Sequence, residues 1–285
     1  MISEQAAVLS FDTFVAPSVP VVTNDLPPGQ SHRAWSPIAA TLISGERDAV
    51  LVDPLLTRQL GEALADWVAA RGKNLTIVYI THGHGDHWFG LGAIRERYPK
   101  VRAVATAQVI EFMRQQVSPK VFASWESRFP GQIQPDVAVA EPLTDPRFEL
   151  EGHEFVVVET GHTDTDYTTT LHVPSIDLVV AGDVVYNDVH VYLAESDHGK
   201  RMQWIRALDA VDALRPRNVV AGHKRPGRAD DPKTVEETRM YIRDFDRLAE
   251  QTSTANELYE QMLLLHPGRI NPGVLWGSAR AVHSR

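Results

Sequence analysis

The sequence predicts a layered α/β domain, and three observations support this fold class. Along most of the 285 residues, short apolar runs typical of buried strands alternate with stretches whose apolar residues recur at helical spacing. The composition, 43% hydrophobic and 23% charged, is that of a globular protein with a sizeable core. Several predicted strands lead directly into metal-capable side chains. We expect a single domain over residues 1–285.

The first part of the chain combines a loop-rich stretch with regular elements. Up to about Trp35, prolines and a Pro-Pro-Gly turn favour loops. Residues 39–42 and 49–52 flank the sequence Gly-Glu-Arg-Asp and are predicted as a β-hairpin. Helical spacing over 60–68 predicts a helix, and the continuous apolar run at 77–80 predicts a strand buried on both faces.

Residues 107–142 interrupt this alternation. Val109, Phe112 and Met113 indicate a helix, and an aromatic-rich stretch with a Pro-Gly turn follows it. We expect a helical insertion or a lid here.

The last part of the chain returns to strands and closes with helices. Strand-like runs lie at residues 155–158, 168–173, 178–181 and 219–221. A C-terminal helical pair is predicted at about 233–266, where the spacing of Thr234 to Glu237 and of Thr254 to Glu257 is that of capping boxes.

Composition excludes several classes of function. The 28 Lys and Arg against 37 Asp and Glu give a net charge of −9, so no nucleic-acid partner is expected. The absence of cysteine excludes disulfides, thiolate zinc sites and a cysteine nucleophile. The first 32 residues lack Lys and Arg, and no apolar run approaches the ~20 residues of a membrane helix. We therefore expect a cytoplasmic protein without a membrane partner; its oligomeric state stays open, with a homodimer as one option.

Metal-capable side chains follow four of the predicted strands. The strand at 77–80 leads into the sequence Thr-His-Gly-His-Gly-Asp-His at 81–87, and the others lead to His162, Asp183 and His223. Strand ends converge at one edge of a sheet, which is the usual ligand crevice of α/β proteins. Imidazoles beside carboxylates, without thiolate, suit a catalytic site for zinc, iron, nickel or copper. The alternatives are a solvated histidine-rich turn at 81–87, a satisfied core histidine at His162 and a turn residue at Asp183; the four motifs together favour a metal site.

The pattern His82-x-His84-x-Asp86-His87, followed by His162, Asp183 and His223, resembles the metallo-β-lactamase superfamily over most of the chain. The resemblance implies a four-layer αββα sandwich with two divalent metal ions at one edge. Zinc is the usual metal of the family, and iron or manganese occurs in some members. The first metal would be held by His82, His84 and His162, the second by Asp86, His87 and His223, and Asp183 would bridge them.

Departures from family patterns narrow the class. Asp183 and the lack of cysteine favour lactonases, thioesterases and phosphodiesterases over dedicated β-lactamases. His84 argues against the flavo-diiron members, which carry Glu there, and Asp166 replaces the second histidine of many glyoxalase-like members. Tyr186 occupies the position of a substrate-binding tyrosine in acyl-homoserine-lactone hydrolases; the alternative is a buried aromatic at a strand end.

The resemblance predicts a metal-dependent hydrolase acting on a small molecule. A metal-bound hydroxide would attack a small ester-like bond, with a lactone preferred. Asp86 or Asp183 would carry a proton to the leaving group, and Tyr186 would stabilise developing charge. The alternatives are a phosphodiesterase, a β-lactam hydrolase and an iron-dependent sulfur dioxygenase.

Other residues near the motifs carry weaker expectations. Asp53 is either an acceptor for a ligand histidine or a turn residue, and Asp164 and Asp166 are expected to orient His162 or to form Asx turns. Three basic residues could grip an anionic substrate or belong to a solvated loop: Lys224, Arg225 and Arg228. Four aromatics could line a pocket or fill the core: Trp88, Phe89, Trp125 and Tyr192. His190 and His198 are expected in a polar loop without a role.

Overall fold

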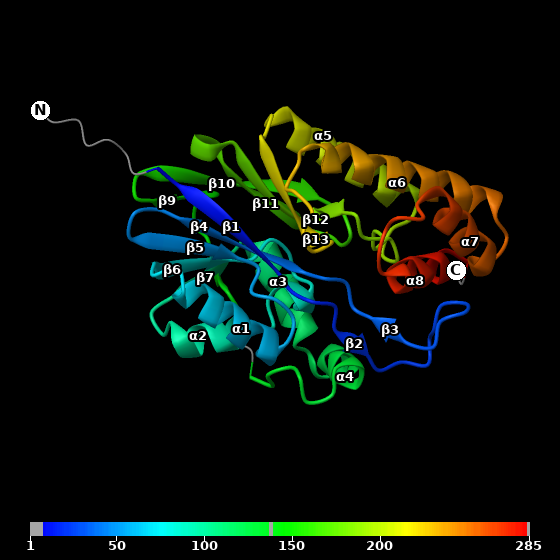
Figure 1. Cartoon of the computed structure of the whole chain (residues 1–285), viewed down its shortest axis with the longest axis horizontal. Coiled ribbons are helices and arrows are strands. Elements are labelled where there is room, and N and C mark those ends of the chain that lie inside the picture. The colour runs from blue at the N-terminus through cyan, green and yellow to red at the C-terminus, as the bar shows by residue number, and fades with distance from the viewer. Residues whose placement is uncertain (1–7, 137–138, 284–285) are drawn as a thin grey trace, which may run out of the picture.

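The computed structural model describes residues 8–136 and 139–283 and has the predicted four-layer αββα architecture. Two β-sheets lie face to face, with α1 (Arg58–Ala69) and α2 (Leu91–Arg97) on one outer side and α5 (His198–Ala213) and α6 (Lys233–Gln251) on the other (Figure 1). No helix in the described part of the chain is both long and apolar enough to cross a membrane.

The first sheet has six strands in the order β1-β4-β5-β6-β7-β8. Their bounds are Ser10–Val15, Ala39–Ser44, Asp48–Val52, Asn74–Tyr79, Arg102–Ala105 and Glu141–Pro142. The hairpin of β4 and β5 is antiparallel, as predicted, and β5 to β8 run parallel. A small separate ribbon is formed by β2 (Pro20–Val21) and β3 (Arg33–Ala34).

The second sheet has five strands in the order β13-β12-β11-β10-β9. In chain order from β9, their bounds are Arg147–Leu150, His153–Gly161, Thr168–Val173, Leu178–Asn187 and Asn218–Lys224. The pairs are antiparallel except for β12 and β13, which are parallel. The second-half strands predicted from the sequence are therefore confirmed.

The continuous apolar sequence of β5 is explained by burial on both faces. Val50 and Val52 pack between the sheets with Phe155 of the second sheet, whereas Ala49 and Leu51 belong to the cluster under the outer helices. Side chains alternate between the two faces of a strand, so a central strand of a sandwich needs apolar residues at every position.

Two segments differ from the sequence expectation. The stretch expected as loops contains β1, which pairs with β4 in the register Ser10↔Ser44; its edge position leaves it partly exposed, so its apolar pattern is weak. His198, expected in a polar loop, begins α5, which Asp197 caps by accepting a hydrogen bond from Lys200 N at 2.9 Å. Trp204 is buried on the inner face of this helix.

The region 107–142 is helical, as predicted. It contains α3 (Ala107–Gln116) and α4 (Pro119–Arg128), and after residues 137–138, which lie outside the described part, the chain returns to the first sheet as β8.

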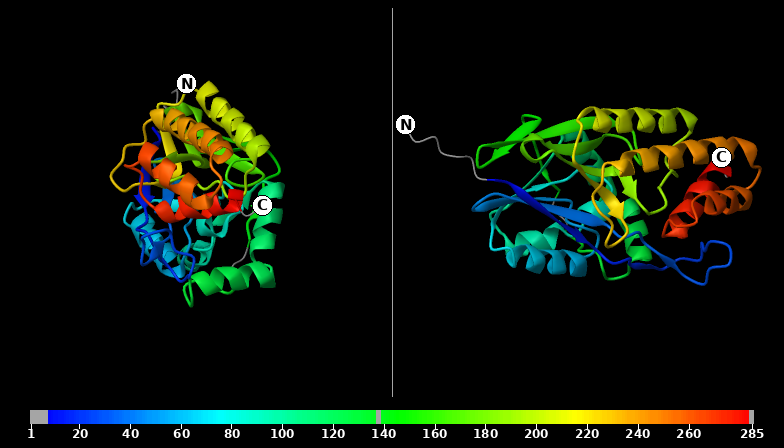
Figure 2. Two further views of the ribbon diagram at one scale, coloured as in Figure 1. Left: turned by 90° about the vertical axis from the view of Figure 1, so that its right-hand side faces the viewer. Right: turned by 45° about the horizontal axis from the view of Figure 1, so that its top comes forward.

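The C-terminal pair is present as α6 and α7 (Ala255–Leu265), and α8 (Pro272–His283) packs against α7 (Figure 2). Thr254 caps α7 by accepting from Glu257 N at 3.2 Å, whereas Thr234 lies inside α6 and donates to Asp231 O at 2.8 Å. The capping prediction was right for Thr254 and wrong for Thr234, because α6 begins one residue earlier at Lys233.

His190 makes the stability of the fold depend on pH. Its side chain is fully buried, its Nδ1 lies 3.0 Å from Tyr241 Oη, and burial lowers its pKa from 6.5 to about 3. The unfolded chain takes up a proton at this residue below 6.5 and the folded chain does not. The contribution of His190 to stability is therefore complete above that pH and falls by roughly 1.4 kcal/mol per unit as pH drops toward 3.

The variant His190→Asn should show a flatter loss of stability between pH 6 and 4, by about one proton. Urea unfolding across this range measures the slope. The exposed His32→Asn serves as the control and should follow the parent protein. Equal slopes for His190→Asn and the parent would contradict the prediction.

Candidate metal centre

The ends of four strands deliver the metal-capable side chains to one place. The loop after β6 carries His82 and His84 and continues into a short 3-10 turn, Gly85–His87. His162 follows β10, while Asp183 and His223 lie within β12 and β13. Close packing requires glycine here: a Cβ on Gly83 would lie 2.2 Å from Phe112 Cδ1, and one on Gly222 would lie 2.2 Å from Asp183 Oδ1.

One cluster consists of Asp86, His87 and His223, whose ligand atoms all lie within 4.8 Å of one another. Asp86 Oδ2 is 3.7 Å from His87 Nε2 and 3.4 Å from His223 Nε2. Asp183 joins this cluster, with Oδ1 3.2 Å from His87 Nε2 and Oδ2 3.2 Å from His223 Nε2. The structure thus brings together all the residues that the sequence predicted for the second metal.

A second cluster consists of His82, His84 and Asp164, again within 4.8 Å. Asp164 Oδ2 lies 2.7 Å from His84 Nδ1 and 3.6 Å from His82 Nε2. Asp166 makes the predicted contact with His162, at 2.6 Å from Nδ1, whereas Asp164 turns to the other two histidines. Asp164 is therefore a further potential ligand that the sequence motif did not identify.

Buried atoms without partners test whether these residues fit a metal. Within the described residues, five buried ligand atoms make no hydrogen bond: His82 Nε2, His87 Nε2, His162 Nε2, Asp164 Oδ2 and Asp183 Oδ1. Unsatisfied buried polar atoms are costly, and four of these five belong to residues of the two clusters: His82, His87, Asp164 and Asp183. Imidazole nitrogens and carboxylate oxygens together are the donor set of a divalent transition metal, so the site fits such ions.

Hydrogen bonds behind the clusters fix which ring nitrogen faces inward. His87 Nδ1 donates to Asp53 Oδ2 at 3.1 Å, so Asp53 is the acceptor for a ligand histidine that the sequence offered as one of two roles. His223 Nδ1 donates to Pro37 O at 3.1 Å. His84 Nε2 lies 3.0 Å from Glu195 Oε1. These contacts direct Nε2 of His87 and of His223, and Nδ1 of His84, toward the carboxylates of the two clusters, where a cation would bind.

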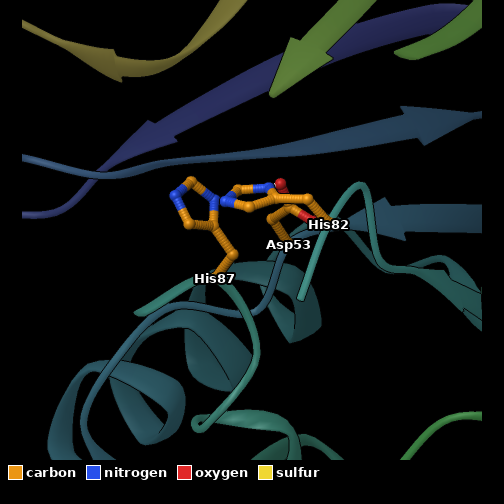
Figure 3. A group of neighbouring side chains, drawn as sticks. All are labelled: Asp53, His82 and His87. Carbon is orange, nitrogen blue, oxygen red and sulfur yellow. The ribbon is translucent and has the colours of Figure 1, made fainter. Parts of the chain in front are cut away.

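Asp53 also anchors the loop that carries the motif. Its Oδ1 accepts from Thr81 N at 2.9 Å and its Oδ2 accepts from Thr81 Oγ1 at 2.7 Å. Figure 3 shows the rings of His82 and His87 side by side next to Asp53, with ring centroids 4.3 Å apart. One carboxylate thus positions the start of the loop and a ligand histidine together.

The charges of the cluster shift its protonation. Burial lowers the pKa of His223, but Asp183 and Asp86 outweigh it and raise that pKa to about 9. Burial also lowers the pKa of His87, but the charges of Asp183 and Asp86 outweigh burial and raise this pKa well above 6.5. Burial and then the charge of Asp183 raise the pKa of Tyr186 well above 10, so its phenol keeps its proton at neutral pH.

Tyr186 supports Asp183 from the wall of the site. Its hydroxyl donates to Asp183 Oδ2 at 2.6 Å, and its ring stacks on His223 with centroids 5.3 Å apart. The side chain is fully buried yet borders the cavity, so the two expectations for Tyr186 are both compatible with its position.

Replacing Tyr186 by Phe should lower kcat/KM about 10–100-fold, because Asp183 loses a donor that orients it. Steady-state kinetics with metal analysis of the same samples measures this effect. Tyr98→Phe removes a partly buried phenol beside α1 and should leave the rate unchanged. Full activity of Tyr186→Phe would exclude a role for the phenol.

A cavity of about 240 Å³ opens over the clusters and borders on His84, Asp86, Asp183 and His223. Its other walls include Arg33, Trp35, Trp125, Arg128, Tyr192 and Glu195. Trp125 and Tyr192 thus line the pocket, one of their two expected roles, whereas Trp88 and Phe89 are fully buried in the core. The sequence did not identify Trp35, whose Nε1 donates to Asp86 Oδ2 at 2.8 Å.

The basic residues after His223 are bound elsewhere. Lys224 is buried and its Nζ pairs with Asp230, while Arg225 Nε lies 2.6 Å from Asp188 Oδ2. Arg228 Nε lies 3.7 Å from the same oxygen. Lys224 is the last residue of β13 and follows His223, so its side chain points to the opposite face of the strand. It is therefore neither in the site nor in a solvated loop.

His190 and His198, for which the sequence predicted no role, lie outside the site. His190 contacts Tyr241, and His198 Nδ1 lies 3.0 Å from Asp246 Oδ2. Each contacts another part of the fold and not the site. The prediction of a polar loop was wrong for His198, which begins α5.

The two-sheet sandwich and its histidine–carboxylate centre define a class of metal-dependent hydrolases. The family model of the metallo-beta-lactamase superfamily matches residues 33–223, more than half of the chain. The chain therefore belongs to the metallo-β-lactamase superfamily. A comparison with curated proteins returned no match.

Solved structures show the same fold at low identity. A metallo-beta-lactamase family protein from Thermus thermophilus is 21% identical with a TM-score of 0.60, covering 95% of this chain and 91% of its own. A metallo-beta-lactamase from Pontibacter korlensis is 16% identical with a TM-score of 0.59, covering 82% and 99%. The metallo-beta-lactamase FIM-1 from Pseudomonas aeruginosa, in a mono-zinc form, is 15% identical with a TM-score of 0.57, covering 84% and 92%. At these identities the likeness concerns the fold.

Proposed function

We propose that this protein hydrolyses a small ester-like bond, with a lactone as the preferred substrate, at two divalent metal ions. The observation that carries the proposal is a set of buried imidazoles and carboxylates, five of whose ligand atoms make no hydrogen bond, together with a small cavity bordered by Asp86, Asp183 and His223. The ligands proposed for the first ion are His82, His84 and His162; those for the second are Asp86, His87 and His223, with Asp183 between the two. Zinc is the expected ion, with iron or manganese as alternatives.

When bound, such ions supply Lewis acidity and lower the pKa of water to roughly 7. Other residues of the chain hold the proposed ligands in position. Asp53 and the carbonyl of Pro37 hold the rings of His87 and His223, and Tyr186 holds Asp183. The carboxylates of Asp86 and Asp183 border the cavity, where either can carry a proton to the leaving oxygen.

The dimensions and walls of the cavity support a compact substrate. A volume of about 240 Å³ suits one small molecule, and the indoles of Trp35 and Trp125 provide apolar walls. The net charge of −9 argues against a nucleic-acid phosphodiester. A lactone combines a small size with an ester bond and is therefore the first substrate class to test.

A substrate panel on metal-loaded protein tests the proposal. The panel comprises five- and six-membered lactones, an aryl thioester, bis-p-nitrophenyl phosphate and nitrocefin, with oxygen consumption recorded in parallel. We expect chelator-sensitive turnover of lactones above the other substrates. Turnover of the phosphodiester or nitrocefin without lactone turnover would contradict the proposal. One iron per chain with oxygen consumption would replace it by an oxygenase.

A further inference from the structure

Arg128 brings a positive charge to the wall of the cavity, which also borders on the carboxylate of Asp86. It is the last residue of α4, and its Nε donates to Ser124 O at 3.1 Å. Its guanidinium carbon lies 4.0 Å from the ring centroid of Trp125 and 5.3 Å from that of Trp35. Among the described residues, no carboxylate lies within ion-pair distance of Arg128.

The other charged side chains of the outer cavity wall have partners. Arg33 Nη1 lies 3.2 Å from Asp25 Oδ2. Glu195 contacts His84 Nε2 at 3.0 Å and accepts from Thr165 Oγ1 at 2.7 Å. A guanidinium packed against two adjacent indoles has lost part of its hydration, which is costly unless an anion approaches it. Arg128 therefore offers its terminal nitrogens to a ligand in the cavity.

Trp35 links this charge to the metal centre. One face of its ring is directed toward Arg128, while its Nε1 donates to Asp86 Oδ2 at 2.8 Å. The guanidinium thus lies about one indole ring away from a proposed metal ligand. A molecule with one end at Asp86 and the other at Arg128 would lie along the aromatic wall.

We propose that Arg128 binds a carboxylate carried by the substrate, so that the preferred substrates are small acidic esters or lactones. This inference rests on the proposed hydrolysis and specifies its substrate class. A guanidinium presents a planar pair of donors that matches a carboxylate, and the flanking indoles exclude water from the pair. The carboxylate would be separated from the scissile bond by a short apolar segment packed on Trp35.

Two matched esters test the role of Arg128: 4-nitrophenyl hydrogen glutarate, which carries a carboxylate, and neutral 4-nitrophenyl butyrate. In the parent protein the acidic ester should have the higher kcat/KM. Arg128→Met keeps an apolar stem beside the indoles and removes the charge. It should reduce the preference for the acidic ester about 10–100-fold, mainly through KM. Arg128→Lys should retain part of the preference.

Arg114→Met, at an exposed arginine of α3 paired with Glu111, should change neither rate. An equal loss for both esters in Arg128→Met would overturn the inference, as would a parent protein without preference. Calorimetric binding of 4-phenylbutyrate and its amide tests Arg128 without turnover. If neither ester is hydrolysed, the proposed function fails, and calorimetry alone decides the inference about Arg128. The inference stands if the parent protein binds 4-phenylbutyrate more tightly than the amide and Arg128→Met loses this preference, and it fails if Arg128→Met keeps the preference.

Discussion

Asp183→Asn should abolish hydrolysis, with a loss of kcat/KM of about 10³-fold or more. The carboxylate of Asp183 contacts His87 through Oδ1 and His223 through Oδ2, each at 3.2 Å. Asparagine has the same shape but offers one oxygen and directs an amide donor at an imidazole nitrogen. As a proposed metal ligand this carboxylate would supply several kcal/mol of transition-state stabilisation, and each 1.4 kcal/mol corresponds to about a tenfold change in rate.

Metal analysis by mass spectrometry and steady-state kinetics on the same samples measure this effect. We expect fewer metal equivalents per chain in Asp183→Asn together with the loss of rate. Asp209→Asn, at an exposed carboxylate of α5, provides a matched control that should keep both. Near-full hydrolysis by Asp183→Asn after metal removal would exclude the proposed mechanism.

The metal centre was largely predictable because its signal is local. His82, His84, Asp86 and His87 lie within one short loop, and each remaining predicted ligand follows or lies within an apolar strand. The expected single sheet edge was wrong in one respect: β6 belongs to the first sheet and β10, β12 and β13 to the second, and the packing of the two sheets brings their ligands together. The same reasoning found β4 to β6 and the strands of the second sheet, whose buried positions give continuous apolar runs.

The residues that were missed depend on packing between distant segments. Trp35 reaches Asp86 from a stretch expected as loops, and Arg128 reaches the cavity from α4. Asp164 has the same side chain as Asp166, and only the course of the loop after β10 decides that Asp164 faces His84 while Asp166 faces His162. No periodicity in the sequence encodes such a choice.

Strand geometry explains why Tyr186 reaches Asp183 while Lys224 points away from the neighbouring His223. Tyr186 lies three positions after Asp183, a spacing that places residues of a regular strand on opposite faces. The register of β12 against β13 shifts between Gly182 and Tyr186, and the phenol reaches Asp183 as a result. No such irregularity lies between His223 and Lys224, so the lysine points away and pairs with Asp230.

Asp53→Asn should weaken metal binding about 10–100-fold, because it changes which nitrogen of His87 carries the proton. Asp53 Oδ2 now accepts from both His87 Nδ1 and Thr81 Oγ1, while Oδ1 accepts from Thr81 N. Asparagine keeps the backbone, which has a φ of 56° that this residue type tolerates, and its oxygen can still accept from Thr81 N. Its amide would then donate toward His87 Nδ1, and the ring proton would move to Nε2.

A proton on His87 Nε2 blocks the atom that lies 3.2 Å from Asp183 Oδ1 and is directed at the proposed metal position. Titration against a chromophoric competing chelator measures the loss, with the midpoint of thermal unfolding recorded for the metal-free proteins. Thr81→Val removes the hydroxyl that donates to Asp53 and lies 3.0 Å from His82 Nδ1, keeps the backbone donor to Asp53, and should weaken binding less. Equal metal affinity in Asp53→Asn and the parent would show that Asp53 acts on the fold of the loop and does not set the protonation of His87.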